Sequence, residues 1–137
     1  MLPNQAKVYF TFCSAKKDDS LRGSSEEVPP EVLYTSQRVR SFVSTCKRKS
    51  VRWAIFSDEY GIWFPEVKHR WYDTSPDDAV GRFRELLADF DQKLKDFDQI
   101  CFCPGVGTGR IHHLYKRLIR ESSLKDKIST RYFMDIV

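Results

Sequence analysis

Short runs of hydrophobic residues divide the chain and predict strands. Residues 7–12, 51–56 and 99–103 are rich in β-branched and aromatic side chains and have the length of buried strands. The alternating residues 130–137 suit a last strand at the edge of a sheet. The pattern therefore predicts four strands.

Helical spacing separates these runs. Residues 36–48 carry apolar side chains three and four positions apart, with Ser36 or the threonine before it as the N-cap, and residues 110–121 show the same spacing. A longer helix is predicted over 77–96. Its apolar stripe consists of Val80, Phe83, Leu87, Phe90, Leu94 and Phe97.

Strands that alternate with helices predict an α/β fold, because parallel strands need crossover connections. We expect one domain over residues 1–137, a three-layer αβα sandwich with a mainly parallel sheet of four strands or slightly more. The polar residues 18–30 lack periodicity and contain two prolines, so they predict a long loop, either a functional flap or partly disordered.

Composition places few limits on function. The hydrophobic content of 41% and charged content of 31% suit a globular protein, and the net charge of +4 allows an anionic partner without requiring one. No run of about 18 apolar residues is present, and the start of the chain lacks signal-peptide features, so we expect no membrane association and a cytoplasmic location. A cluster of basic residues is either a solvated face or a nucleic-acid patch: Arg38, Arg40, Lys47, Arg48, Lys49 and Arg52.

The cysteines indicate burial and not a metal centre. A cytoplasmic chain keeps its thiols reduced, and Cys101 and Cys103, two apart on a strand, share one face. Their spacing differs from that of zinc sites, and only three histidines are present, so we expect no metal and no cofactor.

Three strand ends carry polar residues that suit a binding site. They are residues 13–17, 57–61 and 103–110, and the last includes the glycine-rich turn Gly105-x-Gly107-x-Gly109-Arg110. The carboxyl ends of parallel strands meet at one edge of a sheet, where α/β proteins bind ligands. The glycine-rich turn is either an anion cradle or a purely structural turn.

The chemistry of these ends suggests roles. Lys16 and Lys17 could pair with phosphate or act as nucleophile or base, and Asp73 is either a water-activating carboxylate or a helix cap. Asp58 and Glu59 are further candidates for that carboxylate. We predict Lys16, Lys17 and Asp73 as catalytic residues, and predict ligand contacts from Cys13, Ser14, Tyr34, Ser57, Tyr60, Gly61, Tyr72, Gly105, Gly107, Gly109 and Arg110.

Four short patterns carry a family resemblance. They are Cys13-Ser14-x-Lys16-Lys17, Leu33-Tyr34-Thr35-Ser36, Ser57-x-x-Tyr60-Gly61-Ile62 and Tyr72-Asp73. Together they resemble an uncharacterised prokaryotic α/β family with a domain of unknown function, and distantly the YaaA peroxide-stress proteins and the α/β domain of archaeosine synthase. The resemblance implies a Rossmann-like or uracil-DNA-glycosylase-like fold and a link to nucleobases. The proline before the cysteine and the downstream histidine of the archaeosine-synthase pattern are missing.

Three functions stay open at this point. The first is binding or processing of a nucleoside, nucleotide or modified nucleobase at the strand ends, as in nucleic acid modification. The second is a basic nucleic-acid-binding module, and the third is a protein-interaction module without catalysis. The expected partners are therefore a nucleoside, a nucleotide or nucleic acid.

Overall fold

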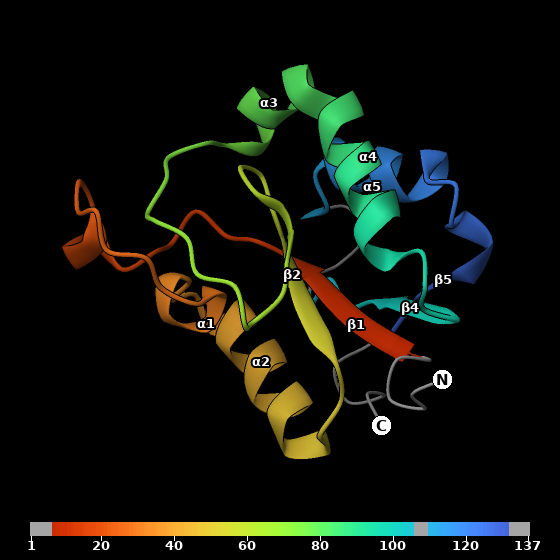
Figure 1. Cartoon of the computed structure of the whole chain (residues 1–137), viewed down its shortest axis with the longest axis horizontal. Helices are drawn as coiled ribbons and strands as arrows, with labels where there is room; N and C mark the ends of the chain where they lie inside the picture. Colours follow the sequence, from red (N-terminus) through yellow and green to blue (C-terminus); the bar gives the residue numbers. More distant parts are fainter. Residues whose placement is uncertain (1–6, 106–109, 132–137) are drawn as a thin grey trace.

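The computed structural model describes residues 7–105 and 110–131 of the chain (Figure 1). Five strands, five α-helices and three short 3-10 turns make up this part. In chain order they are β1 (Lys7–Phe12), η2 (Asp19–Leu21), α1 (Pro30–Leu33), α2 (Gln37–Lys49), β2 (Trp53–Ser57), β3 (Gly61–Trp63), α3 (Pro76–Ala79), η3 (Val80–Arg82), α4 (Phe83–Leu94), β4 (Gln99–Phe102), α5 (His113–Glu121), η5 (Lys125–Lys127) and β5 (Ile128–Thr130). No helix within these described ranges is long and apolar enough to span a membrane.

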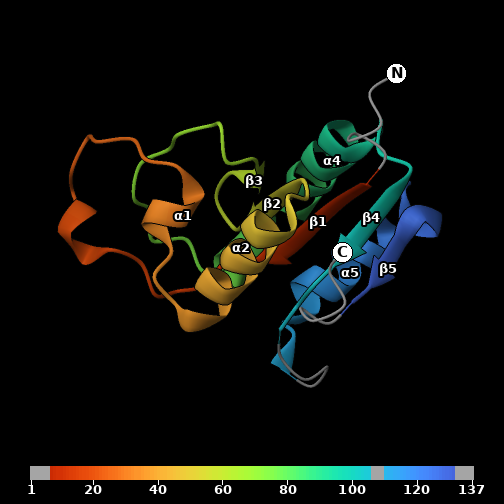
Figure 2. The same ribbon diagram turned by 90° about the horizontal axis from the view of Figure 1, so that it is seen from below.

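The strands form one sheet in the order β3-β2-β1-β4-β5. β1 pairs in parallel with both β2 and β4, and β4 pairs in parallel with β5 (Figure 2). Among these five strands, only β3 runs antiparallel to its neighbour, β2. The predicted α/β class and mainly parallel sheet are confirmed, with five strands in place of four.

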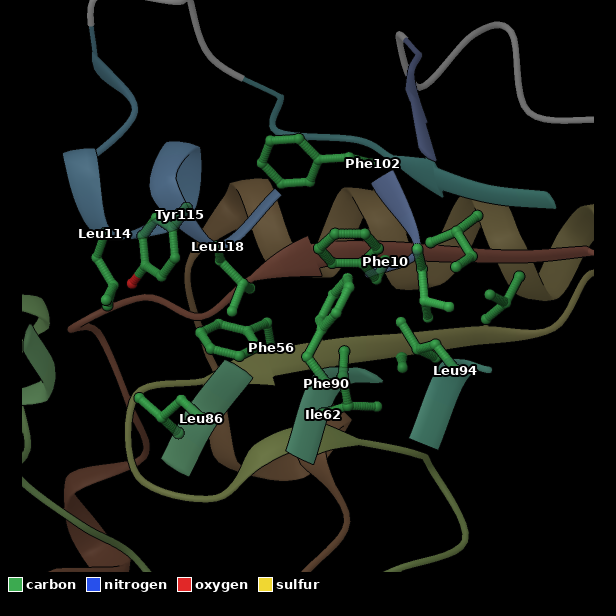
Figure 3. Close-up of a cluster of buried hydrophobic side chains, with 14 of the residues drawn as sticks. Phe10, Phe56, Ile62, Leu86, Phe90, Leu94, Phe102, Leu114, Tyr115 and Leu118 are labelled. Carbon is green, nitrogen blue, oxygen red and sulfur yellow. The ribbon is translucent and has the colours of Figure 1, made fainter. Parts of the chain in front are cut away.

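Helices cover both faces of the sheet, because alternate side chains of the central strands are buried on each (Figure 1). Tyr9, Ile55 and Cys101 pack toward α2 in one cluster. Phe10, Phe56 and Phe102 pack against α4 and α5 in the other. Figure 3 shows rings from the strands meeting leucines from both helices. All four cysteines belong to the cluster on the α2 side, and all are buried free thiols.

The first predicted helix agrees closely with α2. Ser36 is its N-cap, with the hydroxyl accepting from the Val39 N–H, and the apolar stripe of the prediction is buried. The helix predicted over 77–96 is instead divided. Ser75 and Asp78 form a capping box at α3, and a 3-10 turn around Gly81 separates α3 from α4. Glycine is a poor helix former, which accounts for the interruption.

Other differences lie in short elements. A last strand was predicted over 130–137, but β5 ends at Thr130, and residues 132–137 lie outside the described part. The second strand begins at Trp53, since Ser50 takes a left-handed conformation after α2. The three-residue strand β3 was not predicted. It buries Trp63 to 1% exposure.

The segment 18–30 is not a structureless loop. It contains η2 and the start of α1, and Val28 forms a β-bridge with His69. Leu21 and Val28 are buried, so a few widely spaced apolar side chains hold it on the protein. With residues 64–75 it forms an extension on one side of the sheet (Figures 1 and 2).

Gly61 should tolerate no side chain. Its φ of +73° is left-handed, and a Cβ would overlap the carboxylate of Asp89, which accepts the Ile62 N–H. Gly23 has a similar φ of +75°, but a Cβ added there would meet no atom within 4 Å, so it is the matched control. We expect Gly23→Ala to cost about 1 kcal/mol and Gly61→Ala about 3 kcal/mol in urea unfolding. Equal losses would contradict the steric argument.

Candidate functional site

A pocket of about 390 Å³ opens at the carboxyl ends of β1 and β2. Its wall is formed by the chain leaving β1, by Asp58 after β2, by residues 73–76 and by the start of α5. The sheet order reverses here, since β2 and β4 lie on opposite sides of β1, and α/β proteins bind ligands at such points. Residues from all three predicted strand ends therefore meet at one pocket, the third through Arg110.

Asp58 is the most deeply buried carboxyl group of this pocket, with 3% of the residue exposed. The Tyr115 hydroxyl donates to its Oδ1 at 2.6 Å and lies 3.9 Å from the Cys13 sulfur. Burial raises the pKa of Asp58, and this effect exceeds the opposing influence of the Tyr115 hydroxyl, the Cys13 thiol and the Lys17 charge. The pocket thus contains a buried carboxyl group with a raised pKa.

Cys13 and Tyr115 both retain their protons. Burial raises the pKa of the Cys13 thiol to about 12, with the charge of Asp58 adding to the effect. Burial also raises the pKa of Tyr115. These groups are neutral hydrogen-bond donors at physiological pH, and Cys13 is not a ready thiolate nucleophile.

Arg38 turns from α2 into the pocket wall. Its guanidinium donates to the carbonyls of Phe12 at 2.7 Å, Cys13 at 2.9 Å and Pro104 at 3.3 Å. It also donates to the Thr11 hydroxyl at 2.8 Å and stacks 4.0 Å from the Phe12 ring. Sequence periodicity placed this residue in a basic patch on a helix surface, and the structure corrects that interpretation.

Lys17 and Lys16 differ in position. Lys17 lines the pocket, forms a β-bridge with Tyr34, and places its Nζ 4.4 Å from the Tyr72 ring centroid. Lys16 is exposed and does not line the pocket. The structure therefore brings one lysine of the predicted pair to the site.

Three predicted ligand contacts lie beneath the pocket and not on its wall. Tyr34 and Tyr72 are buried, and their hydroxyls hydrogen-bond each other. Ser57 is buried too, and its Oγ accepts the N–H groups of Glu59 and Tyr60. The Ser57 hydroxyl thereby supports the turn that carries Asp58.

The other predicted contacts are divided between the pocket and its surroundings. Ser14, Asp73 and Arg110 line the pocket, and Asp73 is exposed. Tyr60 instead stacks on His69 at 3.8 Å and donates to the Arg70 carbonyl.

Neither of the predicted glycine contacts that the structure describes lines the pocket. Gly61 is the first residue of β3, Gly105 is exposed with a φ of 71°, and Gly107 and Gly109 lie outside the described residues.

His112, the N-cap of α5, lines the pocket on the side of that helix. Its Nδ1 accepts the Leu114 N–H as an N-cap, so Nε2 carries the proton and donates to Asp77 Oδ1 at 2.9 Å. This contact ties α3 to α5 beside the pocket. Within the described residues, no three His, Cys, Asp or Glu side chains group in a way that could hold a metal ion.

Comparisons with known proteins do not assign this site. No family model, curated protein or solved structure matches the chain.

The burial of Asp58 gives a stability test. A carboxyl with a raised folded pKa contributes stability below its usual pKa of 3.8, and that contribution is lost as pH rises through the folded pKa. We therefore expect Asp58→Asn to melt about 2 °C or more above the wild type near pH 8, with the difference shrinking toward pH 4.

Asp89→Asn is the matched control. Asp89 accepts the Ile62 N–H at 2.9 Å and pairs with Lys93 at 2.8 Å, so its loss should cost about 1 kcal/mol. If Asp58→Asn also lowered the melting temperature near pH 8, Asp58 would be a structural carboxylate like Asp89.

Proposed function

We propose that this protein binds and processes a nucleotide-class ligand in the pocket between β1, β2 and α5. The main support for this proposal is the positive charge on the pocket wall. Lys17 and Arg38 both line the pocket, and among the described residues neither forms a salt bridge with a carboxylate. An anionic group on the ligand would supply the missing negative charge.

The environment of Arg38 strengthens this argument. Its hydrogen bonds go to carbonyl and hydroxyl oxygens, which satisfy its donors but do not cancel its charge. Burial lowers the pKa of Arg38, as expected for a cation removed from water. A phosphate in the pocket would gain from this fixed positive charge because a partly buried charge is screened less than an exposed one.

Other features favour a nucleotide over a bare anion. The volume of about 390 Å³ falls in the range of small-molecule sites. The Asp58 carboxyl and the Tyr115 hydroxyl add hydrogen-bonding groups that suit a nucleobase or ribose. The resemblance to nucleobase-linked families supports the same proposal, and with it a Rossmann-like or uracil-DNA-glycosylase-like fold.

The two adjacent lysines test the proposal. In a thermal-shift assay with nucleosides, nucleoside monophosphates and inorganic phosphate, a ligand at 100 times its Kd should stabilise the wild type by about 2.7 kcal/mol. We expect monophosphates to bind best. Lys17→Ala should weaken them about tenfold, since one phosphate contact is lost.

Lys16→Ala is the matched control, because Lys16 carries the same charge one position away and does not line the pocket. It should bind monophosphates like the wild type. Equal weakening in both variants would indicate a general charge effect, and no stabilisation by any nucleotide would refute the proposal.

A second candidate function rests on α2. This helix carries five cations and no acidic residue, and a surface hollow runs along Gln37, Arg40, Ser41, Ser44, Thr45 and Arg48. Arg40 and Arg48 lie about 12 Å apart along the helix at 1.5 Å per residue. Cations and hydroxyls in one row suit the phosphates of a nucleic acid strand.

Salt dependence distinguishes this second candidate. If α2 binds single-stranded oligonucleotides, the slope of log K against log salt should be steep, and Arg40→Ala with Arg48→Ala should reduce it by roughly 1 to 2. Lys116→Ala with Arg120→Ala removes the same charge from α5 and should leave the slope unchanged. A flat salt profile in the wild type would eliminate this function.

A further inference from the structure

We propose that Asp58 and Asp73 are a catalytic acid and base that hydrolyse the N-glycosidic bond of the bound nucleotide. This inference rests on the proposed function and adds the reaction. Asp58 and Asp73 are the two carboxyl groups among the described residues that line the pocket. Hydrolysis at a sugar carbon commonly uses two carboxyl groups in different environments, one that donates a proton and one that activates water.

The two groups differ in the way that this chemistry requires. Asp58 is buried in the pocket wall, whereas Asp73 is exposed. A buried carboxylic acid holds its proton until a leaving group takes it, and an exposed carboxylate has access to solvent water. The environments alone therefore assign Asp58 as the acid and Asp73 as the base.

The local structure brings the two groups to one pocket. Thr74, directly after Asp73, donates its hydroxyl to the Glu59 carboxylate, directly after Asp58. Arg82 donates to the Glu59 carbonyl at 3.1 Å and fixes the same turn from the start of α4. Two segments that are distant in sequence are thereby joined at the residues next to both aspartates.

The groups that face Asp58 come from three other segments. Tyr115 from α5 donates to its Oδ1, and the Cys13 sulfur at the end of β1 lies 3.9 Å from the same Tyr115 hydroxyl. The Lys17 ammonium and the His112 imidazole lie on the same pocket wall as Asp58. Because the hydroxyl and the thiol are uncharged, neither replaces the water that burial removes from around the Asp58 carboxyl. Within the described part of the chain Lys17 forms no salt bridge, so its charge is available to the ligand phosphate.

The proposed step balances with water as the only co-reactant. The Asp58 proton moves to the base nitrogen as the bond from that nitrogen to the sugar carbon breaks. Asp73 takes a proton from water, and the hydroxide adds to the sugar carbon. The products are the free base and the sugar phosphate, and solvent returns one proton to Asp58 and removes one from Asp73.

Release of free base measures this step. The full-length chain is incubated with the common ribonucleoside and deoxyribonucleoside monophosphates, and the free base is separated by chromatography. We expect release by the wild type. Asp58→Asn and Asp73→Asn should each slow it at least about 100-fold while nucleotide affinity, from thermal shift, changes less than about threefold. Asp96→Asn, an exposed aspartate beyond α4, is the control and should match the wild type.

The Tyr115→Phe variant tests whether Asp58 acts as the proton donor or has only a structural role, because the two roles predict different pH profiles of base release. The Tyr115 hydrogen bond lowers the pKa of Asp58, so its removal should move the alkaline limb of the pH profile to higher pH. Unchanged release in Asp58→Asn, or an unmoved alkaline limb, would overturn the assignment of Asp58. Nucleotide binding without base release by the wild type would overturn the reaction and leave the binding function standing. Absence of nucleotide binding would refute the proposed function itself.

Discussion

The site depends on the hydrogen bonds of Arg38 at the end of the central strand. A parallel strand that leaves the sheet has carbonyl oxygens without partners, and unpaired buried carbonyls are costly. Arg38 satisfies those of Phe12 and Cys13 and also reaches Pro104 beyond β4. One guanidinium from α2 thus joins two neighbouring strand ends and gives the pocket its fixed positive charge.

Core and pocket share side chains at this edge. Phe12 and Tyr115 stack at 4.6 Å between ring centroids as part of the hydrophobic cluster, yet both line the pocket (Figure 3 shows Tyr115). The Tyr115 hydroxyl can therefore hold Asp58 with little freedom, since packing fixes its ring. A buried carboxyl is expensive to keep, and such costs are commonly retained where a ligand or a reaction needs them.

The fold is more predictable from the sequence than the site is. The stripe on α2 follows from helical periodicity, and the strands β1 and β4 follow from short runs of β-branched and aromatic residues. The convergence of residues 13–17 with Asp58 follows from the parallel sheet. The strand β3 could not be predicted, because three residues are too few to show alternation. The division of the long helix was signalled only by Gly81.

Spatial neighbours account for what the sequence could not show. Arg38 looks like its neighbour Arg40 in sequence, and only the docking of α2 beside β1 turns one inward and leaves the other exposed. The spacing along α5 predicts Tyr115 as a core residue, and its ring does pack in the core. Its hydroxyl gains a role in the site only through the hydrogen bond to Asp58, which lies 57 positions away in the sequence. Consecutive residues of an extended segment point to opposite sides, so Lys17 faces the pocket and Lys16 does not. A strand end can thus be recognised from sequence, whereas the side chains that complete the site around it come from helices whose packing the sequence leaves open.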